Sequence, residues 1–278
     1  MERMPLGVSR FDEMIGGGAP AGSVVVAASE AGAGGREFCY TATAMNGLAE
    51  ADSDLFEFYY GETRSNVTLP HEVHYVTFTS EPAAIVDEMR FVLEDDLVDS
   101  GTNPVAFADL SREFFQMTPV PTEWYNEQKT NITSLGTDTT RQSVLEALGD
   151  YLSANAAGNL VVIDSVSDLL VAAEAEFGRA NLAMLLKGLK RATYRWGGLM
   201  LLLVNVDVLD RRQLGRIKEA ADGTLLFEWE SGGSERDRTL VVEEFRGVLS
   251  RLEKENIVRF ETEIRDSGFD ISNVRKIR

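Results

Sequence analysis

A run of glycines follows a short apolar segment near the N-terminus, and this pattern could hold phosphate. Residues 23–28 are apolar without alternation, as expected of a strand buried on both faces. They lead into Gly32-Ala33-Gly34-Gly35, and a helix-like stretch follows over residues 36–50. The N–H groups of such a turn converge on an anion, and the helix N-terminus adds about half a positive charge. The order strand, glycine loop, helix therefore predicts a phosphate-binding site, although the glycines could equally be kept for turn geometry alone.

The loop lacks two side chains that a complete phosphate loop needs. A Lys normally reaches the β and γ phosphates, and a Ser or Thr hydroxyl holds Mg²⁺. Here the loop ends in Gly35, Arg36 and Glu37. A guanidinium is planar and longer than an ammonium group, so Arg36 replaces the Lys only in part. Glu37 favours the helix dipole but repels a phosphate nearby.

A second candidate group is the carboxylate of Asp164. It ends the apolar run over residues 159–164, which predicts the most strongly buried strand of the chain. In open α/β sheets, ligands bind at the carboxyl ends of the strands. Asp164 is therefore a candidate ligand for Mg²⁺, and the alternative is a carboxylate that caps the next turn.

Alternating β-rich and helical patterns predict the strands and helices that position the glycine loop and Asp164. This alternation favours an α/β fold with a mostly parallel, twisted sheet flanked by helices on both faces. Further strands are expected at residues 73–78, 104–109 and 199–204, and helices at residues 82–95, 143–156 and 179–196. After residue 220, antiparallel hairpins are expected at residues 223–242 and 257–271.

Two stretches, 51–72 and 117–141, lack clear periodicity, and we expect long surface loops or insertions there. The first is rich in aromatic residues, which favours a small packed cluster over a partner-binding patch. The continuous strand series favours one domain over residues 1–278.

The composition excludes several classes of protein. The 278 residues carry a net charge of −18, with 6 Lys against 21 Arg, which favours a halophilic, archaeal protein over an ordinary acidic one. Nucleic-acid binding needs a basic face, so this composition argues against it. The single Cys39 excludes an internal disulfide and a cysteine-based zinc site. No apolar run is long enough to span a membrane, and no apolar signal follows Met1, so we expect a cytoplasmic protein.

Several motifs together carry a resemblance to a known family. Four segments resemble KaiC-like domains of the RecA and RadA group of P-loop ATPases. They are GVSRFDEMIGGG at residues 7–18, the strand and glycine loop that follow it, YVTFTSEP at residues 75–82 and LVVIDS at residues 160–165. The similarity continues through residues 221–223 and through the terminal hairpin at residues 260–271. It covers nearly the whole chain and implies a RecA-like fold that binds ATP or ADP with Mg²⁺.

The resemblance also exposes departures at the site. The family loop is G-x-P-G-T-G-K-T, and an ungapped alignment places Ser29 at its first Gly, Gly35 at the Lys and Arg36 at the Thr. A one-residue slip places Arg36 at the Lys and Glu37 at the Thr. Asp164 falls at the position of the Mg²⁺-linked carboxylate.

The paired catalytic glutamates of the family are replaced by Thr79 and Ser80. Glu81 lies nearby, and a helix N-terminal role beside Pro82 is favoured over a catalytic one. Of the family's K-x-R-G motif, whose cations reach a neighbouring subunit's nucleotide, Arg246 is kept.

These departures favour a regulatory or scaffolding protein with a degenerate nucleotide site, at which Gly32 to Glu37, Asp164 and Arg246 bind nucleotide weakly. The alternative is an active ATPase in which Arg36 and Glu81 replace the usual Lys and Glu. Implied partners are copies of the chain or related KaiC-like ATPases, in signalling or motility assemblies. A RadA-like DNA-binding factor is disfavoured by the negative charge.

Overall fold

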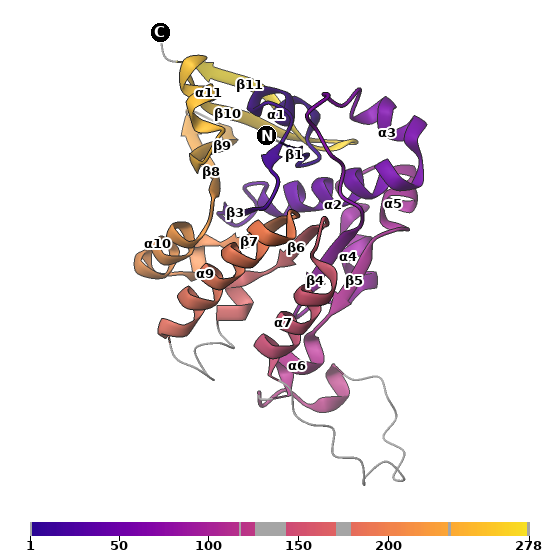
Figure 1. The fold of residues 1–278 in the computed structure, drawn as a ribbon, viewed down its shortest axis with the longest axis vertical. Coiled ribbons are helices and arrows are strands. Elements are labelled where there is room, and N and C mark those ends of the chain that lie inside the picture. The colour runs from indigo at the N-terminus through magenta and orange to yellow at the C-terminus, as the bar shows by residue number, and fades with distance from the viewer. Residues whose placement is uncertain (1, 117, 126–142, 171–178, 233–234, 277–278) are drawn as a thin grey trace.

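The computed structural model describes residues 2–116, 118–125, 143–170, 179–232 and 235–276. Within these ranges one sheet of nine strands forms the centre of the molecule, in the order β11-β10-β9-β8-β3-β7-β6-β4-β5 (Figure 1). Its strands are β3 (Ser23–Ser29), β4 (Val73–Thr77), β5 (Ala106–Asp109), β6 (Leu160–Asp164), β7 (Leu199–Asn205), β8 (Gly223–Gly232), β9 (Glu235–Phe245), β10 (Ile257–Arg265) and β11 (Gly268–Lys276). A separate short pair joins β1 (Arg3–Met4) to β2 (Ala19–Pro20).

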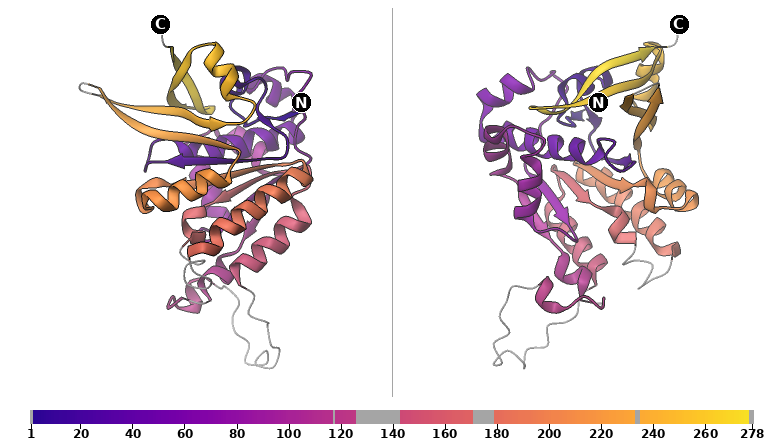
Figure 2. Two further views of the ribbon diagram at one scale, coloured as in Figure 1. Left: turned by 60° about the vertical axis from the view of Figure 1, so that its left-hand side comes forward. Right: turned by 180° about the vertical axis from the view of Figure 1, so that it is seen from behind.

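The sheet is parallel from β5 to β8 and antiparallel from β8 to β11. The predicted α/β class is therefore confirmed, together with the C-terminal antiparallel hairpins. β8 and β9 form a long hairpin that projects from the body of the sheet (Figure 2).

Helices cover both faces of the parallel strands. The described helices are α1 (Ser9–Ile15), α2 (Gly35–Ala51), α3 (Ser53–Tyr59), α4 (Pro82–Met89), α5 (Asp95–Thr102), α6 (Ser111–Phe115), α7 (Val144–Asn155), α9 (Arg179–Trp196), α10 (Arg211–Ala220) and α11 (Leu249–Lys254), with short 3₁₀ turns η1 (Thr122–Trp124) and η3 (Val206–Val208).

Alternate residues of each parallel strand point to opposite faces, so each face has its own apolar core. Val25 and Ala27 of β3 face the core that α2 and α5 cover. Val24 and Val26 face a second core, formed with α7, α9 and α10. The apolar, non-alternating strand sequences follow from burial on both sides.

Two predictions about the elements were wrong. The expected helix over residues 82–95 ends at Met89, and α5 begins only at Asp95, because the chain turns after Met89 and Glu94 N donates to Asp266 O of the C-terminal hairpin. Residues 51–72, expected as a long surface loop or insertion without regular structure, contain α3, whose first turn is capped by the Asp52 carboxylate.

The aromatic residues of that stretch are divided by burial. Phe56 and Tyr60 stack in the core with ring centroids 4.9 Å apart, which agrees with the expected packed cluster. Phe58 is exposed. The prediction for residues 117–141 falls largely outside the described residues, apart from 118–125.

Candidate functional site

The glycine loop joins β3 to α2 at the carboxyl end of a central strand. Gly32 and Gly34 have φ of +72° and +110°, which L side chains rarely adopt, and Gly34 is the N-cap of α2. The predicted order of strand, loop and helix is therefore present. β7 lies between β3 and β6, so the loop and Asp164 lie at the same edge of the sheet.

Arg36 forms a bidentate ion pair with Asp164 across this edge. Its Nη1 and Nη2 lie 2.9 Å and 3.0 Å from Oδ2 and Oδ1 of Asp164. The Tyr75 hydroxyl donates a further hydrogen bond of 2.6 Å to Oδ2. Both carboxylate oxygens are therefore engaged by side chains of the same chain.

Burial raises the pKa of Asp164 above its usual value, while Arg36 and the Tyr75 hydroxyl act in the opposite direction. The Asp164 side chain is 5% exposed, whereas that of Arg36 is 43% exposed. The carboxylate thus depends on the guanidinium for compensation of its charge.

A second carboxylate lies on the other side of Arg36. The Tyr40 hydroxyl donates to Glu88 Oε2 at 2.5 Å, and Arg36 Nη1 lies 3.5 Å from that hydroxyl and 3.9 Å from Glu88 Oε2. Burial, followed by the hydrogen bond to Glu88, raises the pKa of Tyr40, so the phenol stays neutral. These contacts fix the orientation of the guanidinium.

Ser29 and Gly35 approach each other too closely for a side chain at residue 35. A Cβ built on Gly35 would lie 2.5 Å from Ser29 Cβ and 2.8 Å from Ser29 Oγ. The Gly35 N–H points at the same hydroxyl and donates to Ser29 Oγ at 3.3 Å. The Ser29 side chain thus fills the space that a Lys at residue 35 would need.

The projecting hairpin holds the loop from outside. Trp229 N donates to Glu30 Oε2 at 2.8 Å, and the indole Nε1 donates to Ala31 O at 2.9 Å. Arg238 Nε donates to Gly32 O at 3.0 Å, with its guanidinium 4.9 Å from the centre of the Trp229 ring. On the other side, Asp207 Oδ2 accepts from Ala31 N at 2.8 Å.

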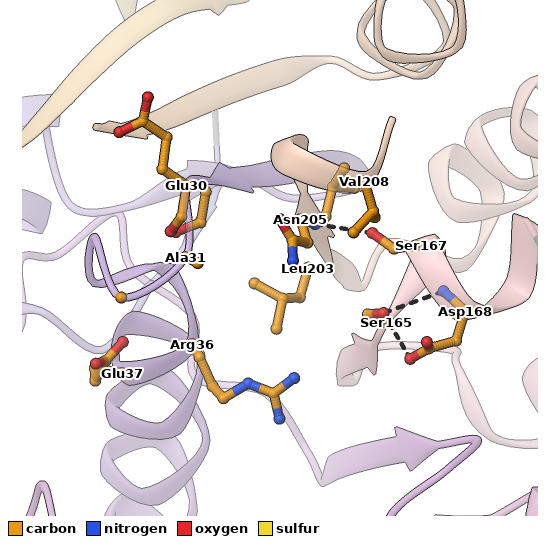
Figure 3. Close-up of a pocket in the computed structure, with 13 residues that line it drawn as sticks. Glu30, Ala31, Arg36, Glu37, Ser165, Ser167, Asp168, Leu203, Asn205 and Val208 are labelled. Atoms are coloured by element: carbon orange, nitrogen blue, oxygen red, sulfur yellow. Dashed lines mark hydrogen bonds between the residues drawn. The ribbon is translucent and has the colours of Figure 1, made fainter. Parts of the chain in front are cut away.

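A pocket of about 230 Å³ opens beside the loop. Its ionisable lining residues are Glu30, Glu37 and Asp168 against Arg36, so carboxylates outnumber cations there. Figure 3 shows Arg36 directed from α2 toward the chain segment with Ser165, and Glu30 directed away toward the strands above. Ser165 Oγ donates to Asp168 Oδ2 at 2.8 Å, and Ser167 Oγ accepts from Asn205 N at 2.8 Å.

Two predicted site residues lie apart from this pocket. Glu81 is exposed and is the N-cap residue of α4, followed by Pro82 at the first helical position. Arg246 follows β9, with Nη1 3.7 Å from Asp222 Oδ1. Since Asp222 N bonds Val24 O near the start of β3, Arg246 lies at the opposite end of this strand from the loop, roughly 16 Å away at 3.3 Å per residue.

Several residues at the site were not predicted from the sequence. Tyr75 is two residues before Thr77, which pairs with Asp164 in the register of β4 and β6. The rule that strand ends share one edge could have suggested it. Glu88, Trp229 and Arg238 come from other elements and carry no local signal.

The residues present do not fit a Mg²⁺–nucleotide group. Both Asp164 oxygens already accept hydrogen bonds from Arg36 or Tyr75, the hydroxyl that holds Mg²⁺ is missing, and the space for a Lys is filled by Ser29. Within the described ranges, no group of three or more His, Cys, Asp or Glu is placed to hold a metal ion.

Comparison with solved structures identifies a protein of the same fold. The crystal structure of the KaiC-like protein PH0186 from the hyperthermophilic archaeon Pyrococcus horikoshii OT3 matches with a TM-score of 0.62 over 98% of this chain and 99% of that one, at 18% sequence identity. The chain therefore has a KaiC-like, RecA-like fold.

The other comparisons add no assignment. No protein-family model matches the chain, and no curated protein matches it. In the part of the chain that the structure describes, no helix has both the length and the apolar character needed to cross a membrane.

Proposed function

We propose that this chain is a regulatory or scaffolding protein that uses a KaiC-like fold without the hydrolytic apparatus of a P-loop ATPase. The observation that carries this proposal is the bidentate pair of Arg36 and Asp164. The guanidinium of Arg36 contacts both oxygens of the carboxylate that would serve Mg²⁺ and so takes the place of the metal charge.

The energetic consequence follows from the burial of Asp164. Breaking a buried ion pair by removing one partner costs about 3–5 kcal/mol. Arg36 is half exposed, so the low end of this range applies. A nucleotide that recruited Asp164 for Mg²⁺ would first have to displace Arg36 from this pair, and the cost of breaking the pair would reduce its affinity.

Two further observations support the proposal. The excess of carboxylates in the pocket lining disfavours an incoming triphosphate. Glu81 stands at the N-cap of α4 and does not line the pocket, which disfavours the alternative of an active ATPase that uses Arg36 and Glu81. The protein would then act through contacts with copies of itself or with related proteins of the same fold.

Isothermal titration with ATP and Mg²⁺ in molar KCl tests the proposal. We expect affinity no better than about 1 mM and no steady release of phosphate. Micromolar binding with continuous phosphate release would contradict it and would favour the ATPase.

A positive control shows whether the assay can detect a restored site. The triple variant Ser29→Gly/Gly35→Lys/Arg36→Thr removes the clash at residue 35, supplies the Lys and the hydroxyl, and frees Asp164. We expect this variant to bind Mg²⁺–ATP more tightly than the natural chain. Equal affinity of the two would argue that Ser29, Gly35 and Arg36 are not what closes the site.

A further inference from the structure

A basic depression lies at the end of the sheet opposite the glycine loop. It has a volume of about 420 Å³, and its lining includes Lys190, Arg191, Tyr194, Arg195, Asp222 and Arg246. Four cationic side chains thus surround one carboxylate in a chain whose net charge is −18. This local excess of positive charge contrasts with the excess of acidic residues in the chain as a whole.

Part of this charge is compensated within the chain. Lys190 Nζ lies 3.0 Å from Asp222 Oδ1 and donates to Ala221 O at 2.5 Å. Arg246 Nη1 lies 3.7 Å from the same carboxylate oxygen. One carboxylate therefore serves two cations, and Lys190 has a structural role in joining α9 to the start of β8.

Arg191 and Arg195 are the uncompensated members. Both are exposed, and neither has an ion pair or side-chain hydrogen bond to another residue in the described ranges. They are four residues apart on α9, so their side chains lie on one face of the helix.

The helix dipole explains the position of only one of these two arginines. Arg195 is in the last turn of α9, where a cation is favourable beside the carboxyl-end dipole. Arg191 is one turn earlier, and like charges at this spacing are mutually destabilising by about 0.2–0.5 kcal/mol. An anion held between the two guanidinium groups would remove this repulsion.

We propose that the basic depression binds a small molecule that carries a diphosphate or a comparable multivalent anion. Guanidinium groups bind phosphate oxygens in bidentate fashion, and two of them a helical turn apart match adjacent phosphates. Tyr194, which is 80% exposed between them, offers an aromatic surface to an attached organic group. The site is separate from the glycine loop and does not depend on the proposed function.

Isothermal titration with inorganic pyrophosphate tests this site directly. The titration is run with EDTA at about 0.1 M salt, where charges are screened over about 10 Å. We expect the natural chain to bind and the double variant Arg191→Gln/Arg195→Gln to bind at least about 100-fold more weakly, since each charge-assisted contact contributes about tenfold or more.

A matched control removes the same charge elsewhere. Arg211 and Arg212 are exposed in the first turn of α10 and do not line the depression. The variant Arg211→Gln/Arg212→Gln should bind pyrophosphate as the natural chain does. Circular dichroism of both variants checks that the fold is retained.

Three results would overturn the proposal. The first is an absence of pyrophosphate binding to the natural chain, and the second is equal binding by both double variants. The third is a change in sedimentation coefficient for Arg191→Gln/Arg195→Gln without a change in pyrophosphate affinity, which would assign the basic face to contacts between copies of the chain.

Discussion

The contact between Ser29 and Gly35 predicts a strong energetic coupling between the two positions. In the variant Gly35→Ala, the added methyl group would lie 2.5 Å from Ser29 Cβ and 3.4 Å from Phe227 Cδ2. Neither neighbour can move easily, because Ser29 ends a central strand and Phe227 is fully buried. Overpacking of this kind costs about 1–3 kcal/mol, and the higher helix propensity of Ala offsets up to about 1 kcal/mol.

A double-mutant cycle separates the clash from these other effects. Ser29→Gly alone removes the hydroxyl that accepts from Gly35 N and donates to Glu30 O, at a cost of about 1–2 kcal/mol. In the double variant the methyl group has space, and the clash is absent. The helix-propensity effect of Gly35→Ala and the loss of the Ser29 hydrogen bonds are the same in the single and double variants, so both cancel and the cycle reports the clash alone. We expect the two substitutions to be less destabilising together than their sum by about 1–3 kcal/mol.

Urea unfolding measures this coupling without changing the ionic strength. Gly149→Ala in α7 is the matched control, because a Cβ there meets nothing within 4 Å. It should leave stability unchanged or raise it by up to about 1 kcal/mol. Additivity of Ser29→Gly and Gly35→Ala within about 0.5 kcal/mol would refute the claim that Ser29 excludes a side chain at residue 35.

Two further predictions concern buried carboxylates. Arg36→Met should lower the free energy of unfolding in urea by about 3 kcal/mol, because Asp164 is left buried without its cation. Asp164→Asn in the same background should recover most of this loss. A loss under about 0.5 kcal/mol for Arg36→Met would contradict the prediction. Burial raises the pKa of Asp12 from 3.8 to about 7, so the folded state retains a proton that the unfolded state loses, and stability should fall by about 4 kcal/mol as the pH rises between these values. Asp12→Asn should abolish that part of the pH dependence, and an unchanged profile would show that Asp12 is not its source.

Much of the fold was predictable from local pattern. Residues 24–28 and 160–163 are apolar without alternation, and the predicted strands that contain them, 23–28 and 159–164, both form central strands buried on two sides. The helices over residues 143–156 and 179–196 were also predicted within a few positions. The break between α4 and α5 was not, because it depends on the contact of Glu94 with the distant C-terminal hairpin.

The sequence predicted several residues of the candidate site but not which of them contact one another. Gly32, Gly34 and Asp164 were expected at one edge of the sheet, and the structure brings them there. Arg36 was expected to face a phosphate. Its partner is instead Asp164, which is 128 positions away in the chain, and no local pattern specifies such a pair.

The sequence by itself determined which groups are missing from the glycine loop, since the identities of Gly35, Arg36, Thr79 and Ser80 require no coordinates. Only the tertiary structure decided what the remaining groups do. Strand order places β6 two strands from β3, within reach of a long guanidinium, and the turn of the loop brings residues 29 and 35 into contact. Both outcomes depend on distances between segments that are remote in the chain, whereas sequence periodicity reports only which face of each element is buried.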